Sequence, residues 1–338
     1  MKIGVIGLGF MGVTHLKALR EITQAELTAV CSDIPERLSG DLSGIQGNLG
    51  GPGVKFDFSK IGRYTEVDDI LKDPNVEAVD ICLPTNLHAP VAIQAIQAGK
   101  HVLVEKPMAL DATGCDQMIC AAEKAGKILM AAQVLRFFPA YVMLRQQIRY
   151  GNVGPVYSAL FRRRCAAPLW TVWSANKGLS GGGVFDLLIH DVDMCLHLFG
   201  APREISASGY EDLAGGVDTL DARLYYDNIP SVTVTGGWHH KGSYPFSMEY
   251  TVVTSAGTVD YSSEGRPPTL YRADGEKQDL KAPDVDGYQA EIAYFIECCA
   301  SGTQPKLCPP RESASAVALT NLLVEARKEK GTKIACKL

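Results

Sequence analysis

The chain opens with a short apolar segment, Lys2–Ile6, that runs directly into the sequence GLGFMG. In this G-x-G-x-x-G pattern the first glycine allows a tight turn, the second lets the backbone approach a pyrophosphate, and the third lets a helix pack closely. The N-terminus of that helix would face the anion. Because the pattern joins the first predicted strand to the first predicted helix, it predicts a dinucleotide site formed by Gly7, Gly9, Phe10, Met11 and Gly12.

The first third of the chain alternates short apolar runs with helical stretches. The predicted strands are Lys2–Ile6, Leu27–Cys31, Ala78–Cys82, His101–Val104 and Ile128–Ala132. The predicted helices between them are Met11–Ile22, Leu87–Ala98 and Asp111–Ala125, the last with Asp111 as its N-cap and Gly126 just after its end. This alternation is typical of βαβ units. We therefore predict a doubly wound parallel sheet in an N-terminal domain, residues 1–132.

One segment of this domain breaks the alternation. Residues 39–62 are rich in glycine and polar residues where a second crossover helix is expected. We interpret the segment as a long loop near the adenosine end of the dinucleotide. The sequence leaves open whether the loop is mobile or shapes a surface for a partner.

The remaining residues, 133–338, change to an alternating pattern of apolar and polar positions. The extended segments are Val156–Arg163, Asp218–Tyr226, Ser231–Thr235, Ser247–Thr254 and Gly257–Tyr261. The helical segments are Val184–Phe199, Gln289–Ala300 and Arg311–Glu329. Such a pattern predicts a second domain, α/β in class, whose mostly antiparallel sheet is buried on one face. The length of 338 residues agrees with two domains.

The composition argues against several classes of partner. A net charge of −5 disfavours nucleic acid and membrane surfaces as partners. The start of the chain is typical of a mature strand rather than a signal peptide, and no apolar run is long enough to cross a bilayer. The ten cysteines include no C-x-x-C pair, which favours buried, reduced thiols in a cytoplasmic protein and predicts no metal site.

The end of the second strand bears on the choice of dinucleotide. A carboxylate about 20 residues after the glycines is expected to bind the adenosine ribose, and Asp33 lies near that position. Its charge would repel a 2′-phosphate, so NAD is preferred. Ser32 and Arg37 nearby are compatible with a phosphate, which keeps NADP possible.

The sequence VLVEKPMAL contains a second candidate site. Glu105, Lys106 and Pro107 follow an apolar strand, at the edge of the sheet where ligands bind in such folds. Pro107 favours an extended conformation at Lys106 and so directs the lysine. By position alone, a surface lysine is an equally good interpretation.

A third candidate site lies in the sequence SGGGVFDLLIHDVD. Asp186 and His190 are four residues apart, so a helix presents them on one face. The glycines of 181–183 let the backbone come close to a ligand, and histidine suits the removal of a hydroxyl proton at neutral pH. The alternative is a solvated polar stripe continued by Asp193 and His197. We favour a catalytic pair.

Taken together, these motifs resemble the glucose–fructose oxidoreductase/inositol dehydrogenase/MocA family. The resemblance rests on GLGFMG, on LPTNLHAP at 83–90, on EKP at 105–107, on D-x-x-x-H at 186–190 and on RFFPAY at 136–141. It extends to the helix with Tyr288 and Glu291 and so covers essentially the whole chain. It implies a Rossmann domain followed by an α/β domain with an open, mostly antiparallel sheet, which commonly forms homodimers or homotetramers.

The same resemblance implies roles for individual residues. Lys106 is expected to contact both the nicotinamide ribose and a substrate hydroxyl, and Gln133 is expected near the nicotinamide. The cofactor cleft is expected to be lined by Pro84, Thr85, Asn86, His88 and Glu105. The chain departs from the family where Leu188 replaces a frequent glycine, and where Ser32 replaces the aspartate usual in the NAD enzymes.

The predicted reaction is the reversible oxidation of a secondary alcohol of a sugar, sugar derivative, glycoside or cyclic polyol. His190 would take the hydroxyl proton, Lys106 would donate hydrogen bonds to the developing alkoxide, and Asp186 would orient the imidazole or substrate. Further substrate contacts are expected from aromatic and polar side chains, namely Arg164, Trp170, Trp173, Lys177, His239, His240 and Tyr244. The run Arg162–Arg164 hints at an anionic substrate, although alternation in a strand would divide it between two faces.

Two other functions remain open from the sequence. One is a glycosidase of the same fold that uses bound NAD as a recycled oxidant. The other is a sugar- or dinucleotide-sensing regulator without catalysis, which would have no need for Lys106, Asp186 and His190 together.

Overall fold

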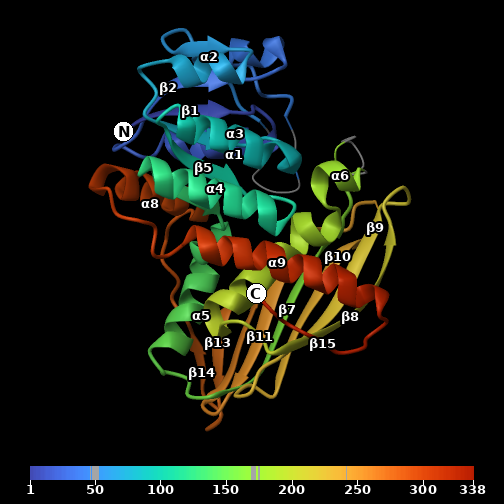
Figure 1. The fold of residues 1–338 in the computed structure, drawn as a ribbon. Coiled ribbons are helices and arrows are strands. Elements are labelled where there is room, and N and C mark those ends of the chain that lie inside the picture. The colour runs from blue at the N-terminus through green and yellow to red at the C-terminus, as the bar shows by residue number, and fades with distance from the viewer. Residues whose placement is uncertain (46, 48–52, 169–172, 174–175, 241) are drawn as a thin grey trace. The chain divides into compact units, whose positions relative to one another are not determined.

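The computed structural model describes residues 1–45, 47, 53–168, 173, 176–240 and 242–338, without the side chain of His239. These residues form two compact units (Figure 1). The first unit contains residues 1–134 and 285–314, and the second contains residues 135–284 and 315–338. The expected division at residue 132 assigned 285–314 to the second domain, whereas these residues lie in the first unit.

A six-stranded parallel sheet forms the centre of the first unit. Its strands are β1 (Lys2–Ile6), β2 (Glu26–Cys31), β3 (Gly62–Tyr64), β4 (Ala78–Ile81), β5 (His101–Glu105) and β6 (Leu129–Ala132). Their order is β3-β2-β1-β4-β5-β6, and every pair is parallel. This is a strand order of dinucleotide-binding sheets, so the predicted doubly wound fold is confirmed. Strand β3 is short and was not predicted.

The helices of the first unit are α1 (Phe10–Leu19), α2 (Val67–Lys72), α3 (His88–Gln97), α4 (Ala112–Ala125) and α8 (Gly287–Ser301). The predicted caps of α4 are confirmed, because the Asp111 side chain accepts a hydrogen bond from Gly114 N at 2.8 Å and Gly126 adopts φ +64°. Helix α8 packs against α1 and β5, which explains its place in the first unit. The predicted long loop follows a short 3-10 helix, Pro35–Ser39, and its residues 46 and 48–52 lie outside the described part.

A nine-stranded sheet forms the second unit. Its strands are β7 (Val156–Ala166), β8 (Glu204–Asp212), β9 (Val217–Tyr225), β10 (Ser231–His240), β11 (Ser247–Thr254), β12 (Gly257–Ser262), β13 (Arg266–Arg272), β14 (Lys277–Asp279) and β15 (Ile334–Ala335). The order is β14-β13-β12-β11-β7-β10-β9-β8-β15. All pairs are antiparallel except β7 with β10, so the mostly antiparallel sheet is confirmed.

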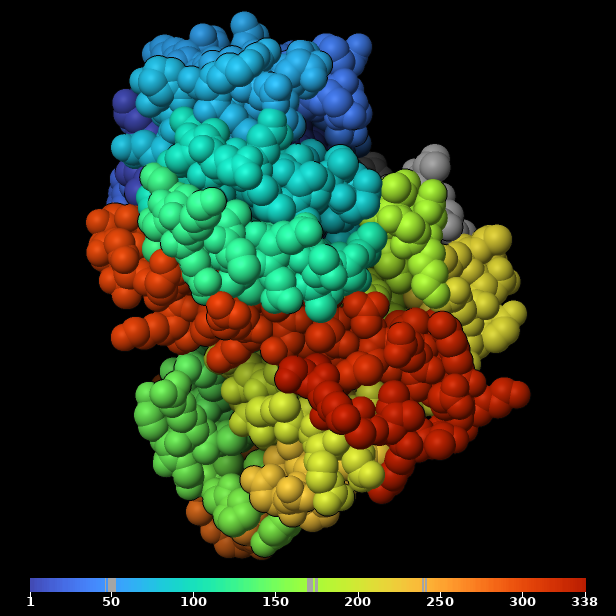
Figure 2. Space-filling view, viewed as in Figure 1, coloured from blue at the N-terminus to red at the C-terminus, as the bar shows by residue number. Residues whose placement is uncertain are grey.

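Helices cover one face of this sheet. They are α5 (Pro139–Arg149), α7 (Ile189–Phe199) and α9 (Pro310–Lys328), with the short α6 (Lys177–Ser180) nearby in sequence. Leu319, Leu323 and Ala326 of α9 belong to one apolar core with the sheet, and Figure 1 shows α9 lying across it. In Figure 2, α9 and the C-terminal segment form much of the visible surface of this unit. Leu160 and Val253 remain partly exposed on β7 and β11, as an open sheet face requires.

Two expectations from composition can be compared with the structure. All ten cysteines are free thiols, and eight of them are buried, in agreement with the expected buried thiols. No described helix combines the length and apolar character that a membrane span needs.

Candidate active site

The glycine turn, residues 7–12, has the shape that a pyrophosphate site needs. Gly7 adopts φ +98°, and a Cβ there would overlap the carbonyl oxygen of Cys82. A Cβ on Gly12 would overlap the carbonyl oxygen of Gly7, so α1 can approach β1 only with glycine there. At Gly9, by contrast, a Cβ would have no described atom within 4 Å. The turn therefore leaves open space at the N-terminus of α1, where Phe10 and Met11 are half-buried, and it fits a dinucleotide.

The predicted adenosine-end residues lie beside this turn. Gly7 N donates to Cys31 O at 2.9 Å, so the end of β2 adjoins the glycines. Ser32 is 3% exposed, and its Oγ accepts from Ile34 N at 3.2 Å. Asp33 is exposed and Arg37 is half-buried. Of the three, Asp33 has the accessible carboxylate that a ribose contact requires.

The turn after β4 is tied to the lysine turn, residues 105–107. His88 is buried, with Nδ1 2.7 Å from Pro107 O and Nε2 2.8 Å from Leu83 O. Burial lowers the pKa of His88, although the two carbonyls oppose that shift. Both ring nitrogens thus face protein carbonyls. Of the other predicted residues here, Thr85 is buried, Pro84 is exposed and Asn86 is half-buried.

Gln133, directly after β6, has the strongest signature of a missing polar ligand. It is 1% exposed, and neither atom of its amide has a hydrogen-bond partner in the described part of the chain. A buried polar group without a partner costs about 1–3 kcal/mol. The orphaned amide lies at the carboxyl edge of the parallel sheet, where a bound dinucleotide would supply a partner.

Glu105 and Lys106 lie at the end of β5. Glu105 is 5% exposed, and its Oε2 accepts a hydrogen bond from Lys106 N at 2.9 Å. Its Oε1 lies 3.0 Å from His15 Nε2. Lys106 is half-buried and precedes a cis peptide bond to Pro107. His15 was not among the predicted site residues, although a histidine among apolar residues of a helix next to the glycines was a signal.

In the second unit, the predicted catalytic pair lies on a helical segment that begins as a π-helix and continues as an α-helix. Residues Val184–Leu188 form a π-helix, and α7 follows from Ile189. The prediction of one α-helix over 184–199 is therefore corrected in its first turn, and π segments are frequent at functional sites. Among residues 181–190, only Asp186 and His190 are half-buried, and the others are all buried. Both side chains thus reach the accessible side of an otherwise buried segment.

The other positions of this segment explain why it is held so tightly. Leu188, which replaces the family's frequent glycine, is 0% exposed and belongs to the apolar core, so it does not line an open pocket. Val184 N donates to Asp218 Oδ2 at 3.0 Å. Arg327 Nη1 of α9 donates to Asp218 Oδ1 at 2.6 Å. The start of the helix is thereby anchored to β9 and α9.

Two buried ion pairs involve residues that follow His190 on α7. Arg163 of β7 donates from Nε and Nη2 to Asp191 at 2.8 and 3.0 Å, and Arg136 donates to Asp193 at 2.8 and 2.6 Å. Burial alone would lower the pKa of Arg163, but Asp191, Tyr141 and Tyr261 together outweigh it and raise that pKa. Asp193 is 1% exposed, which corrects the solvated stripe considered from the sequence.

The arginine run divides between two faces, as alternation predicted. Arg163 is 2% exposed and is used by Asp191, so it is not a substrate contact. Arg162 and Arg164 both pair with Glu249 on β11. Arg164 also lies over the Tyr244 ring, 5.7 Å from its centroid, and the His240 ring stacks on Tyr244 at 3.6 Å. The structure thus brings together three predicted substrate contacts.

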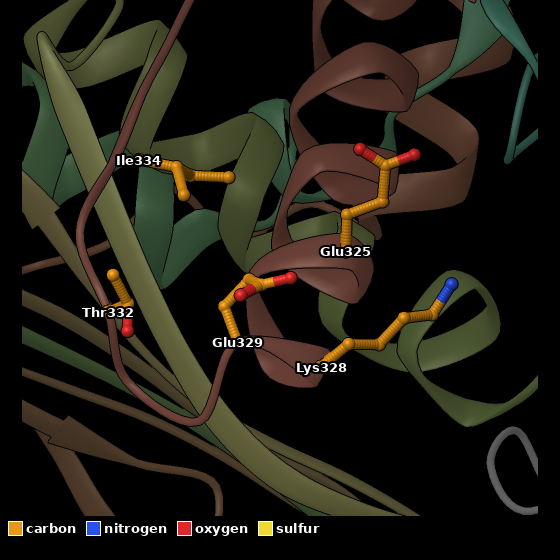
Figure 3. A pocket seen from close by; sticks show the side chains of 5 residues that line it. All are labelled: Glu325, Lys328, Glu329, Thr332 and Ile334. Atoms are coloured by element: carbon orange, nitrogen blue, oxygen red, sulfur yellow. The ribbon is translucent and has the colours of Figure 1, made fainter.

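The remaining substrate candidates are less closely grouped. Trp173 is half-buried, and its Nε1 donates to Leu179 O at 3.2 Å. Lys177 pairs with Glu211. Trp170 and the side chain of His239 lie outside the described residues. A shallow pocket of about 430 Å³ in the second unit is lined by none of the predicted residues; Figure 3 shows its lining, Glu325, Lys328, Glu329, Thr332 and Ile334.

The chain is similar to known dehydrogenases over most of its length. Among curated proteins, the myo-inositol 2-dehydrogenase of Thermotoga maritima is 29% identical over 320 residues, 90% of each chain. The trans-1,2-dihydrobenzene-1,2-diol dehydrogenase of Mus musculus is 32% identical over 298 residues, 82% of this chain and 84% of the mouse enzyme. A levoglucosan dehydrogenase, solved with NADH and levoglucosan, has a TM-score of 0.84 over all of both chains at 19% identity, which supports the fold.

Two family models match successive parts of the sequence. Residues 1–133 match the model described as an oxidoreductase family with an NAD-binding Rossmann fold. Residues 141–260 match the Gfo/Idh/MocA C-terminal domain. The first unit is therefore an NAD-binding Rossmann domain, and the predicted resemblance is confirmed. The chain belongs to the Gfo/Idh/MocA family of oxidoreductases.

Proposed function

We propose that this oxidoreductase transfers a hydride between nicotinamide and a secondary alcohol of a sugar, sugar derivative, glycoside or cyclic polyol. The observation that carries the proposal is the exposure pattern of residues 181–190, in which only Asp186 and His190 reach an accessible surface. A carboxylate and an imidazole held in this way suit proton transfer to and from a hydroxyl. Relatives named for oxidation of myo-inositol and of a cyclic diol support the same substrate class.

The proposed catalytic residues have different roles in the reaction. The bound nicotinamide supplies the acceptor or donor of the hydride. His190 takes the proton of the hydroxyl during oxidation, and Asp186 orients the imidazole or the substrate. The Lys106 ammonium donates hydrogen bonds to the oxygen as negative charge develops on it, and it also contacts the nicotinamide ribose.

The preferred cofactor is NAD, with NADP as the second candidate. Support comes from the exposed Asp33 carboxylate beside the glycine turn, which suits a ribose hydroxyl and repels a 2′-phosphate. The cofactor would be held by the glycine turn with Phe10 and Met11, by Ser32, Asp33 and Arg37, and by Pro84, Thr85, Asn86, His88, Glu105, Lys106 and Gln133. The orphaned amide of Gln133 supports a polar partner from the ligand at that position.

We propose that the second unit binds the substrate through Arg164, Trp173 and His239, in addition to the catalytic residues. Arg164, stacked over Tyr244 next to His240, provides donors and an aromatic face of the kind that sugars bind. We also propose a homodimer or homotetramer through the open sheet face, and a cytoplasmic location, which the ten free thiols support.

The experiment is a panel of sugars, inositols and glycosides with NAD and NADP, followed by nicotinamide absorbance. The proposal expects net formation of the reduced cofactor with at least one sugar or polyol. Cleavage of a chromogenic glycoside without net NADH would favour the redox-recycling glycosidase instead. Sugar and dinucleotide binding with no turnover of any substrate would favour a regulator and contradict the proposal.

A further inference from the structure

A cluster of ionisable side chains is buried in the first unit below the glycine turn. His15 of α1 lies between Asp80 of β4 and Glu105 of β5. His15 Nδ1 is 2.8 Å from Asp80 Oδ2, and His15 Nε2 is 3.0 Å from Glu105 Oε1. His15 and Asp80 are 0% exposed and Glu105 is 5% exposed. Neither His15 nor Asp80 belongs to the predicted catalytic or cofactor-binding residues.

The contacts favour a particular charge state of the imidazole. Nδ1 of His15 is hydrogen-bonded to Asp80, whereas Nε2 approaches Glu105 Oε1 at 3.0 Å without hydrogen-bond geometry, so the second contact is favourable as an ion pair when the imidazole is charged. Burial alone would lower the pKa of His15, but the carboxylate of Asp80 and the Cys82 thiol outweigh it and raise the pKa well above 6.5. The His15 imidazolium and Lys106 in turn lower the pKa of Glu105 against the effect of its burial.

The surroundings of His15 contain few other charged groups. Cys82 Sγ lies 3.5 Å from Nδ1, and the Tyr288 ring of α8 is centred 6.1 Å from the imidazole. Glu291, also buried, lies on the same helix close to Tyr288. Asp80, Cys82 and Glu105 are therefore the groups nearest to the imidazole.

A metal ion is a weaker explanation for this cluster. Nδ1 of His15, a carboxylate oxygen of Asp80 and Sγ of Cys82 do lie within 4.8 Å of one another. However, this described group offers three ligands, and structural zinc sites take four. The 2.8 Å distance from Nδ1 to Oδ2 is also that of a charge-assisted hydrogen bond.

We propose that His15 is a positioning residue for Lys106, acting through Glu105. The imidazolium fixes Oε1 of the Glu105 carboxylate, and Oε2 of the same carboxylate accepts the hydrogen bond from Lys106 N at 2.9 Å. His15 is on the helix that starts at the glycine turn. Its imidazole ring therefore connects the glycine turn to the lysine turn. His88 holds the same turn at Pro107 O. The inference rests on the proposed catalytic role of Lys106.

The test compares His15→Gln with Asp80→Asn. His15→Gln removes the cation that holds Glu105, whereas Asp80→Asn keeps the imidazole but removes the carboxylate that raises its pKa. We expect His15→Gln to lower kcat about 10- to 100-fold, since a displacement of about 1 Å at a reacting group costs about 10²-fold. The acid limb of its pH–rate profile should move to higher pH, because Glu105 loses its neutralising partner. In Asp80→Asn the imidazole loses its proton at lower pH, so its kcat should lie near the wild type at low pH and approach that of His15→Gln as the pH rises.

A second measurement does not depend on turnover. Hydrogen exchange at the Lys106 amide should be about tenfold faster or more in His15→Gln, and close to wild type in Asp80→Asn only at low pH, where its imidazole is still charged. NADH affinity should change less than about threefold in both. If His15→Gln does not fold, the ¹⁵N spectrum of the wild-type imidazole at pH 8 decides, because the proposal requires two protonated nitrogens.

Three results would overturn the inference. They are a neutral His15 at pH 8, unchanged kcat and amide exchange in folded His15→Gln, or equal losses in both variants at low pH that follow their loss of stability. Absence of turnover by the wild-type protein on every substrate would refute the proposed function instead. In that case the amide exchange still decides whether His15 positions the lysine turn.

Discussion

The two units hold their proposed catalytic side chains with buried ion pairs of different chemistry. In the first unit, the support of Lys106 is a histidine between two carboxylates. In the second unit, His190 is followed by Asp191 and Asp193, each paired with a buried arginine. An arginine stays charged at every pH that a protein tolerates, whereas a histidine can lose its proton. The first unit therefore loses this support as His15 is deprotonated at rising pH, whereas the Arg163–Asp191 pair of the second unit loses it only in acid, when Asp191, whose pKa burial raises, takes up a proton.

The largest effect should come from removing the supported side chains themselves. Lys106→Ala and His190→Ala should each lower kcat about 10²- to 10⁴-fold, because each removes a group that handles the transferred proton or the developing charge. NADH affinity should change little in His190→Ala. Lys124→Ala, an exposed lysine on α4, is the matched control and should keep wild-type activity. Near-normal turnover in either catalytic variant would show that the buried ion pairs of that unit do not hold a catalytic side chain.

Breaking a permanent pair should be the largest effect on stability. Arg163→Met leaves the Asp191 carboxylate buried without its partner, which should lower the free energy of unfolding by about 3–5 kcal/mol. Replacing both partners, as Arg163→Met with Asp191→Leu, should recover much of that loss. Arg162→Met, on the half-exposed neighbouring position, should cost less than about 1 kcal/mol. Urea unfolding measures all three, and equal losses for Arg162→Met and Arg163→Met would contradict the assignment.

The smallest expected effect is the loss of stability in His15→Gln, and its pH dependence distinguishes the two units. The pKa of His15 is raised in the folded protein, so its stabilisation is complete below the unfolded value near 6.5 and is lost as the pH rises through the folded pKa. The pKa of Glu105 is lowered, so its stabilisation is present above about 4.3 and is lost as the pH falls through its folded pKa. His15→Gln should therefore cost about 1–3 kcal/mol near pH 6 and less at alkaline pH.

The loss caused by Arg163→Met should grow towards alkaline pH, because burial raises the pKa of Asp191 and the unpaired carboxyl is charged there, so this variant is a control of opposite sign for the first unit. Urea unfolding of both variants over a series of pH values checks this. A His15→Gln loss that does not shrink at alkaline pH would show that the His15 contacts do not depend on its charge.

Sequence patterns predicted the parts of the fold that depend on local order. The strand–glycine–helix start was readable because each glycine has a local reason, a positive φ at Gly7 or close helix approach at Gly12. Strand β3 and helix α2 were missed because three and six residues are too short for a clear period. The motifs also placed Asp186 and His190 on one accessible side, although the π turn at 184–188 could not be read from spacing.

The supports could not be predicted, because they join residues far apart in the chain. His15 and Asp80 are 65 positions apart, and Arg136 and Asp193 are 57 apart. From the sequence alone, Asp193 continued a polar stripe, and only the packing of Arg136 against α7 shows why it is buried. Two local signals were overlooked, His15 among apolar residues of α1 and Asp80, a carboxylate inside a strand whose other residues are apolar.

The central claim, hydride transfer from a sugar or polyol carbon, has a direct test. The protein is incubated with NAD and with myo-inositol, scyllo-inositol or levoglucosan deuterated at the ring carbons, and the reduced dinucleotide is analysed by mass spectrometry. We expect the reduced nicotinamide to carry one deuterium with at least one of these substrates. Reduced cofactor without deuterium, or substrate consumption without reduced cofactor, would contradict it.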